Sequence, residues 1–299
     1  MQHSFLHTVA NVAWVARTGG RASLPLLRTY FRLKLLEHVA AGLRDVGVFR
    51  TRILDMPVTF FDHYWLVEMF EEIFLREQYR FESGKRRPVV LDVGSNIGLS
   101  ILYFKSLFPD ARITGFEPDP QAFPILEANV RANQLADVVL LNRAVYDGRR
   151  SIDLYGSSQS VGSPQTSTRS GRVDGVGTPV PATTLSEHVT EAVDFVKLDV
   201  EGAELVVVQE LERSGKLALV DRIAIEYHHH VDEDDDRLST LLSVLERGGF
   251  GYQLEARFDT SARPRARLYQ NILVHAYRKS ASLLGVSCSG RARSGEERS

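Results

Sequence analysis

The pattern of apolar and polar positions predicts a helical N-terminal segment followed by alternating strands and helices. From Leu26 to Val39, apolar residues recur every three or four positions, which is the spacing of one helix face. The pattern over residues 51–62 predicts extended chain, and that over residues 65–81 predicts a second amphipathic helix. From residue 89 onward, short apolar runs alternate with helical patterns, as in βαβ units with a parallel sheet.

Seven apolar runs predict the strands of one sheet. They cover residues 89–93, 113–116, 137–145, 195–200, 216–228, 251–258 and 271–277. The last two runs have no helical pattern between them, so we expect a hairpin. The last strand is then antiparallel in an otherwise parallel sheet.

The composition divides the chain into three expected parts. Residues 1–87 pack on or cap a core domain of residues 88–279, and residues 280–299 form a disordered tail rich in Ser, Arg and Gly. Within the core domain, residues 147–184 are rich in Ser, Gly, Thr and Pro and leave the end of the third strand. This segment is either a flap over a substrate or a solvated insertion. The basic helix around residues 26–39 packs against the core, or else contacts a membrane surface or a partner helix.

Charge and cysteine content exclude several classes of protein. A formal net charge of -2 argues against a nucleic-acid partner, because phosphate-binding surfaces carry a basic excess. The single cysteine, Cys288, excludes an intramolecular disulfide and disfavours a cysteine zinc site. No apolar run approaches the roughly 20 residues that span a bilayer. The first residues lack a basic leader, so we expect a cytoplasmic protein.

The segment 89–100, VVLDVGSNIGLS, carries the most informative motif. A buried strand that runs into a glycine turn and opens a helix is a common site for nucleotide-type ligands. Asn96 stands between Gly94 and Gly98 where dinucleotide sites have their middle glycine. The carboxylate of Asp92 would repel a pyrophosphate but suits the ammonium and ribose hydroxyls of S-adenosylmethionine. The motif therefore indicates a methyl donor.

The next strand delivers a second candidate residue for the same site. Glu117 follows the run 113–116 and lies about twenty residues after the glycine turn, where an acid commonly accepts hydrogen bonds from a ribose diol. NAD and S-adenosylmethionine both contain ribose, so Glu117 does not distinguish between them. Asp92 and Asn96 favour S-adenosylmethionine.

Acidic residues gather at the predicted end of the fourth strand. Asp199 and Glu201 lie at the carboxyl edge, where open α/β sheets keep their active sites. They can accept a proton, hold a cation or bind the amine of the donor. Glu204 falls in the first turn of the next helix, where an acid complements the helix dipole. We interpret Lys197 as a salt-bridge residue.

A histidine ends the fifth strand at the same edge. His228 follows Glu226, and a histidine near neutral pH is a natural general base for a hydroxyl nucleophile. The run His228 to His230 invites a metal interpretation, but successive strand residues point in different directions. We therefore assign no metal ligand, and a divalent cation between one histidine, Asp199 and Glu201 stays open.

Four ordered motifs together resemble the FkbM-type methyltransferases. They are DVGSNIGLSILYF, FEPDPQAFPILEANVRAN, KLDVEGAE and IEYH, and the resemblance covers residues 70–277. It implies a class I methyltransferase (Rossmann-like) α/β fold. Together with the apolar pattern, this predicts a seven-stranded, mostly parallel sheet with the last strand antiparallel, plus the N-terminal helices. It also implies S-adenosylmethionine as cofactor and O-methylation of a small-molecule hydroxyl, as on a polyketide or sugar.

The resemblance also suggests roles for individual residues. The donor would contact Asp92, Gly94, Asn96, Gly98 and Glu117, with Asn142 or Ala144 near the adenine, and the acceptor would face Asp199, Glu201 and His228. The segment TTLSEHV departs from the family, because Ser186 and Glu187 replace an acidic pair. N-methylation, an NAD-dependent oxidoreductase on a similar fold and a non-enzymatic binding protein remain as alternatives. The sequence does not indicate the oligomeric state.

Overall fold

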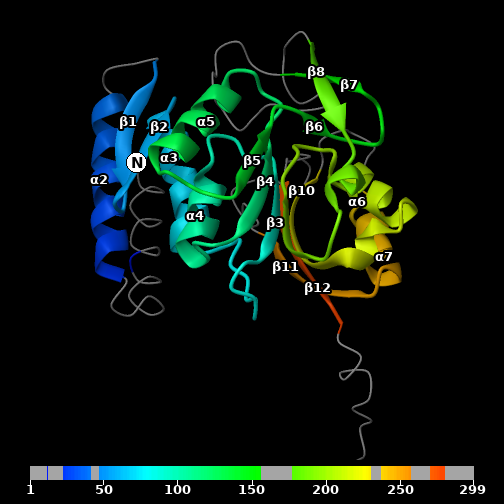
Figure 1. Cartoon of the computed structure of the whole chain (residues 1–299). Coiled ribbons are helices and arrows are strands. Elements are labelled where there is room, and N and C mark those ends of the chain that lie inside the picture. Colours follow the sequence, from blue (N-terminus) through cyan, green and yellow to red (C-terminus); the bar gives the residue numbers. More distant parts are fainter. Residues whose placement is uncertain are drawn as a thin grey trace, which may run out of the picture.

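The computed structural model contains a seven-stranded sheet with helices on both faces (Figure 1). It describes residue 12 and residues 23–41, 47–155, 177–229, 237–256 and 270–279. The predicted tail 280–299 lies outside these residues, as do residues 156–176 of the predicted flap and His230.

The strand order confirms the expected fold class. The order is β11-β12-β10-β9-β3-β4-β5, and β12 runs antiparallel between β10 and β11. The bounds are β3 Val89–Val93, β4 Arg112–Phe116, β5 Val138–Leu141, β9 Val193–Leu198, β10 Val220–His229, β11 Phe250–Ala256 and β12 Gln270–Arg278. From β3 the chain moves outward to β5 and then returns to β9 on the other side of β3. Ligands of open α/β sheets bind at the carboxyl ends of strands around such a reversal.

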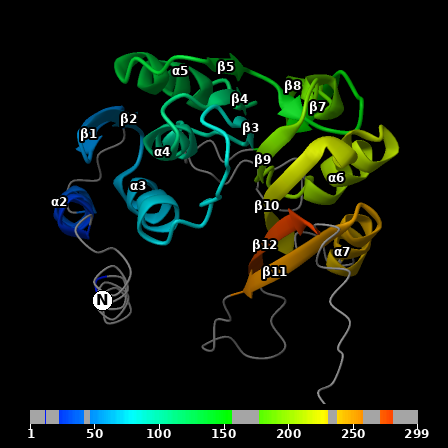
Figure 2. The same ribbon diagram turned by 60° about the horizontal axis from the view of Figure 1, so that its bottom comes forward.

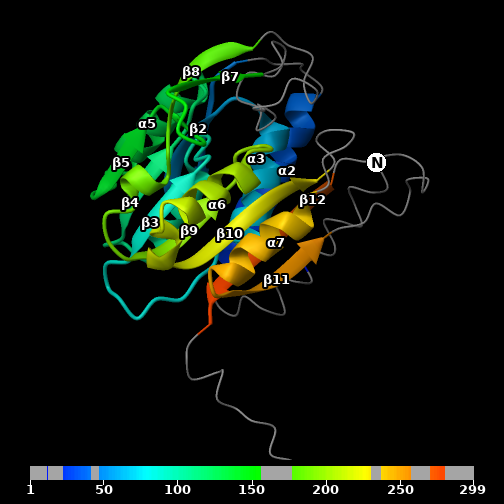
Figure 3. The same cartoon turned by 90° about the vertical axis from the view of Figure 1, so that its right-hand side faces the viewer.

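The two faces of the sheet are covered by different helices (Figure 2). One face carries α3 His63–Phe70, α4 Leu99–Leu107 and α5 Ala122–Ala132, and the other carries α6 Glu204–Arg213 and α7 Leu238–Arg247 (Figure 3). Successive residues of a strand point to opposite faces. Val90 therefore packs in the cluster with α4, whereas Leu91 and Val93 pack in the cluster with α6 and α7.

The N-terminal segment packs on the first of these faces. It comprises α2 Ser23–Ala41, the hairpin of β1 Phe49–Ile53 with β2 Met56–Phe60, α3, and the π-helical turn η2 Glu71–Leu75. The buried amide of Asn129 on α5 pairs with the N–H and the carbonyl of Thr59, which ties the hairpin to the core. The single helix predicted over residues 65–81 is wrong in length, because helical structure ends at Leu75.

Two strand predictions are corrected by the structure. The run 137–145 forms β5 and a separate strand β6 Ala144–Val145, which joins β7 Ser151–Leu154 and β8 Thr178–Thr183 in a small second sheet. The run 216–228 begins with a 3-10 helix, η4 Lys216–Leu219, before β10 starts.

Among the described residues, no helix has the length and apolar character needed to cross a bilayer.

Candidate active site

The turn after β3 holds three strand ends together. Gly94 has φ +86°, and a Cβ on it would lie 1.9 Å from the carbonyl oxygen of Asp199 at the end of β9. The N–H groups of Gly94 and Ser95 both donate to the carbonyl of Phe116 at the end of β4. Only glycine allows β3 and β9 to approach this closely in a left-handed conformation. The turn is thus fixed before any ligand binds.

Glu117 is held beside this turn by backbone donors. Its Oε2 accepts from the N–H of Asn96 at 2.7 Å, and its Oε1 accepts from the N–H of Asp119 at 2.9 Å. Asn96 has φ 47°, so the turn presents its N–H to the carboxylate. Burial raises the pKa of Glu117 to about 7. The carboxylate borders a cavity and is oriented for a ligand with paired hydroxyls.

Asp92 and Gly98 support the turn from behind. The Asp92 side chain is fully buried, Ser100 Oγ donates to its Oδ2 at 2.7 Å, and Lys197 Nζ lies 3.8 Å from its Oδ1. A Cβ on Gly98 would lie 2.7 Å from Leu126, so this glycine allows close packing of α5. Neither residue lines the cavity. The sequence predicts direct contact between Asp92 and a ligand, but the position of Asp92 does not favour such a contact.

The cavity at this edge of the sheet has a volume of about 320 Å³ and extends over two groups of residues. We call them the β3–β4 side and the β9–β10 side. The β3–β4 side is lined by Val93, Gly94, Ser95, Asn96, Leu99, Ser100, Phe116, Glu117, Pro118, Arg143, Ala144, Val145 and Leu154. The β9–β10 side is lined by Trp65, Glu68, Met69, Glu72, Ile73, Gln78, Tyr79, Lys197, Asp199, Val200, Glu201, Glu226 and Asn271.

Asn142 and Ala144, the two candidates for an adenine contact, are placed differently. Ala144 lines the cavity. The Asn142 amide instead donates to the carbonyls of Glu117 and Pro118, at 2.8 and 3.3 Å. Asn142 therefore fixes the segment that carries Glu117, and of the two only Ala144 lies among the lining residues.

A buried lysine neutralises the acids at the centre of the cavity. Lys197 Nζ donates to the carbonyl of Gly94 at 2.6 Å and lies 3.3 Å from Asp199 Oδ2 and 5.3 Å from the centre of the Tyr79 ring. Burial lowers the pKa of Lys197, but the charges of Asp199 and Asp92 outweigh it, so the net shift is upward. The side chain is an ammonium, and the predicted salt-bridge role is confirmed.

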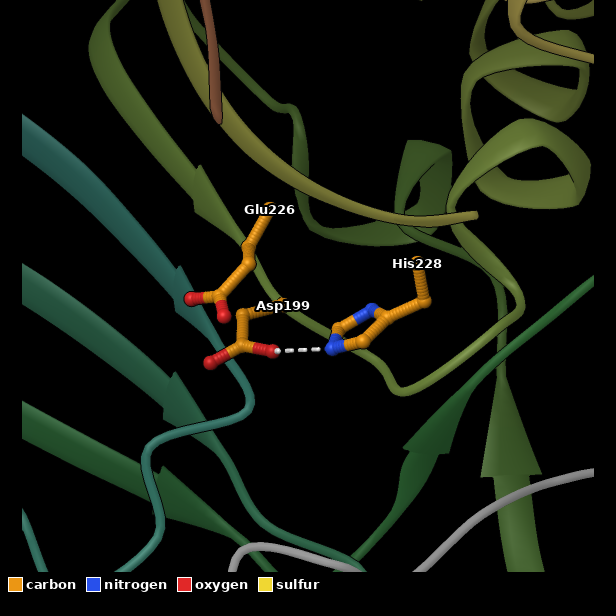
Figure 4. A group of neighbouring side chains, drawn as sticks. All are labelled: Asp199, Glu226 and His228. Atoms are coloured by element: carbon orange, nitrogen blue, oxygen red, sulfur yellow. Dashed lines mark ion pairs between the residues drawn. The ribbon is translucent and has the colours of Figure 1, made fainter. Parts of the chain in front are cut away.

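Asp199 and Glu226 form a carboxylate pair (Figure 4), and the Lys197 ammonium lies next to Asp199. Tyr79 Oη donates to Glu226 Oε2 at 3.3 Å, and the Asn271 amide donates to Oε1. Burial and, after it, the charge of Asp199 raise the pKa of Glu226 to about 8. Two neighbouring carboxylates at one site retain a proton to higher pH than either alone. The pair is suited to exchanging a proton near neutral pH.

His228 lies behind these acids and contacts carboxylates through both ring nitrogens. Nδ1 is 2.7 Å from Glu204 Oε1, and Nε2 is 2.9 Å from Glu201 Oε2 and 3.8 Å from Asp199 Oδ1. Burial lowers the pKa of His228, but Glu204 and the nearby acids outweigh it and raise it overall. His228 does not line the cavity. This geometry favours an imidazolium that positions Glu201 and Asp199.

The sequence interpretation missed two functional candidates at this edge. Glu204 is buried and pairs with His228, so it does more than complement a helix dipole. Glu226 has no role in the sequence prediction, although it follows the apolar residues of β10 as His228 does. The signal was the spacing of two residues between Glu226 and His228, which puts both on the same face of the strand.

The cluster fits a metal ion poorly. Oxygen or nitrogen atoms of Asp199, Glu226 and His228 lie within 4.8 Å of one another, which a cation could bridge. The Lys197 ammonium already neutralises Asp199, and both His228 nitrogens face other carboxylates. We assign no divalent cation to these residues.

The segment TTLSEHV, which departs from the family pattern, has a structural role. Ser186 Oγ donates to Glu210 on α6, and Glu187 accepts from the hydroxyl of Thr183. Neither Ser186 nor Glu187 lines the cavity. The replacement of an acidic pair there does not alter the candidate site.

Comparison with known proteins identifies the class and the family. The matching family is one of methyltransferases. The family model described as the methyltransferase FkbM domain matches residues 92–252, more than half of the chain. The chain belongs to the FkbM methyltransferase family, which sets aside the NAD-dependent alternative.

The individual relatives are distant or match short segments. Methyltransferase sdnD of Sordaria araneosa is 37% identical over 65 residues, which are 22% of this chain and 25% of that protein. Methyltransferase 1 of Beauveria bassiana is 24% identical over 62% of this chain and 81% of its own length. The crystal structure of methyltransferase FkbM from Methylobacillus flagellatus is 16% identical with a TM-score of 0.45, covering 71% of this chain and 53% of that one. The match thus spans a quarter of the first relative and about half of the first structure.

Proposed function

We propose that this protein transfers the methyl group of S-adenosylmethionine to a hydroxyl group of a small molecule. One observation carries the proposal. A single cavity joins Glu117, held by two backbone N–H groups, to the Asp199–Glu226 carboxylate pair. The first group suits a ribose diol, and the second suits removal of a hydroxyl proton.

The β3–β4 side has the groups to hold the donor, which supplies an electrophilic methyl group on a sulfonium. Glu117 accepts the ribose hydroxyls through its two oxygens, and Asn96 keeps that carboxylate in place. Ala144 borders the adenine. The lining carries more carboxylates than cationic groups, because only Arg143 and Lys197 are basic, and this complements a cationic ligand.

On the β9–β10 side, Glu226 takes the proton of the acceptor hydroxyl. It lines the cavity and has a raised pKa, whereas His228 lies behind it and contacts two carboxylates. Lys197 pairs with Asp199 and holds it in position. His228 is a positioning residue, because it reaches the cavity only through Glu201 and Asp199. A base matters more for a hydroxyl than for a neutral amine, whose lone pair attacks without prior proton removal.

Part of the N-terminal segment, from α3 to Tyr79, completes the acceptor wall in this proposal. Trp65 and Met69 of α3, Glu72 of η2 and Tyr79 line the cavity, and Tyr79 donates to Glu226 of β10. π-helical turns such as η2 are often found at functional sites. The segment is therefore part of the active site as well as a cap on the sheet.

Transfer of labelled methyl from S-adenosylmethionine tests the proposal. Matched acceptors that carry a hydroxyl, an amine or hydrogen at one position are compared for the wild type, Glu226→Gln and the control Glu127→Gln, whose side chain is exposed on α5. We expect label on hydroxyl acceptors only, lost in Glu226→Gln and kept in the control. Label on amines alone would overturn the choice of acceptor atom. Chelation of divalent cations should leave the rate unchanged.

A further inference from the structure

The outer face of α2 concentrates exposed apolar side chains. Eleven large hydrophobic side chains are exposed among the described residues, and five of them belong to this one helix. They are Leu24, Phe31, Leu35, Leu36 and Val39, with exposed fractions of 36 to 63%. Scattered exposed apolar residues are ordinary, but a contiguous group marks an interaction surface.

The same face carries basic charge. Arg28 and Arg32 are exposed beside these apolar residues, and Arg50 and Arg52 are exposed on the neighbouring strand β1. The only acid in the α2 sequence is Glu37, which is half-buried and pairs with Lys34 at 2.6 Å. A protein with a net charge of -2 therefore presents a basic, apolar face here.

The helix is fixed to the body of the protein through its opposite face. Thr29, Tyr30 and Leu33 are buried, and Thr29 Oγ1 accepts from the N–H of Leu54 at 3.3 Å. Figure 1 shows α2 at the outer edge of the molecule, next to β1. The exposed residues thus lie on the outward side of a helix whose inner side is anchored.

We propose that the outer face of α2 binds the surface of a membrane that contains anionic lipids. Apolar residues flanked by arginines are typical of helices that lie in the interface, with the apolar side chains at the acyl boundary and the guanidinium groups on the lipid phosphates. Charge complementarity favours this occupant over a second copy of the chain, whose own α2 face would bring arginines against arginines. No residue of α2 lines the cavity, so this surface is independent of the acceptor assignment.

Vesicle flotation of the full chain tests this proposal. Vesicles of phosphatidylcholine alone are compared with vesicles of phosphatidylcholine and phosphatidylglycerol in equal amounts. We expect binding to the anionic vesicles only, weakened by salt. The double variant Phe31→Ser/Leu35→Ser and the double variant Arg28→Gln/Arg32→Gln should each lower the partition coefficient at least about tenfold.

Matched controls remove exposed residues elsewhere. Val139→Ser/Leu254→Ser takes away comparable apolar side chains, and Arg149→Gln/Arg150→Gln takes away exposed arginines, and both should bind like the wild type. Unchanged thermal unfolding midpoints show that all variants fold. A wild type that stays unbound, or α2 variants that bind as well as the wild type, would overturn the proposal. So would a dimer in solution that Phe31→Ser/Leu35→Ser dissociates, without vesicle binding, because it would assign the face to a second copy.

Discussion

The two sides of the cavity are built in different ways. Most of the β3–β4 side comes from one continuous stretch, residues 93–118, in which a strand, a turn and a helix follow one another. The β9–β10 side gathers Trp65, Tyr79, Lys197 and Asn271 from segments far apart in the chain. One side is therefore determined by local sequence, and the other depends on the whole fold.

The acids on the two sides are also held differently. Glu117 is fixed by backbone N–H groups, which no side-chain substitution removes. Glu226 and Asp199 are fixed by the side chains of Tyr79, Lys197 and His228. The β3–β4 side should therefore respond to single substitutions independently, whereas substitutions on the β9–β10 side should be coupled.

The largest effect on the β9–β10 side is expected for Glu226→Gln. The variant keeps the shape of the side chain but cannot take a proton, so turnover should fall by about a hundredfold or more. The dissociation constant for S-adenosylmethionine should stay within about twofold of the wild type, since Glu226 is not among the groups that hold Glu117. Steady-state kinetics and calorimetry measure the two quantities. An equal loss of donor affinity would show that the two sides are not separate.

The closeness of β3 and β9 can be tested by adding one methyl group. Gly94→Ala adds a Cβ at a position with a left-handed backbone and places it against the carbonyl oxygen of Asp199. The substitution should therefore lower the free energy of unfolding by about 3 kcal/mol. Gly215→Ala is the control, because Gly215 has φ +72° and nothing within 4 Å of an added Cβ. It should cost only about 1 kcal/mol for its backbone conformation. If urea unfolding gives the same loss of free energy for both variants, the backbone moves to avoid the contact with Asp199.

The fold could largely be predicted from the sequence because its signals are local. Apolar runs predicted the seven strands along the chain and the C-terminal hairpin, whereas the order of the strands in the sheet comes from the structure. The predicted strand over 137–145 failed because Asn142 turns back to bind the carbonyls after β4, a contact that needs the folded β4. On α2, Leu36 and Val39 have helical spacing but are exposed, because periodicity does not show which neighbour covers a face.

The candidate site, like the fold, could be predicted only where its residues lie close together in the sequence. The position of Glu117 beside Asn96 follows from a strand–turn–helix unit with familiar spacing. The pairing of His228 with Glu204, and the enclosure of Lys197 by Asp92 and Asp199, join residues of different strands and helices. No pattern within one element reports these distances.

A smaller effect is expected for His228→Asn. If His228 only positions Glu201 and Asp199, turnover should fall about tenfold, and the pH limb near 8 that belongs to Glu226 should remain. The loss should not add to that of Glu204→Gln, because the two residues form one contact. Loss of the pH limb in His228→Asn would instead make His228 the base.

The smallest effect is the pH dependence of donor binding. The Glu117 carboxyl, with its pKa of about 7, is neutral below that pH and a poorer hydrogen-bond acceptor. Affinity for S-adenosylmethionine should rise by about threefold to tenfold as the pH increases from about 6 to about 8. The same raised pKa means that the free energy of unfolding falls as pH rises from 4.5 towards 7, because the unfolded chain releases this proton first. Glu117→Gln should abolish the pH dependence of donor binding and remove the contribution of Glu117 to the pH dependence of unfolding.

Calorimetric titration with S-adenosylmethionine tests the central assignment most directly. The wild type and the surface control Glu127→Ala should bind the donor with the same affinity, and Glu117→Ala should lose at least about tenfold. Equal affinity in Glu117→Ala, or no binding to the wild type, would contradict the assignment of this cavity to the methyl donor.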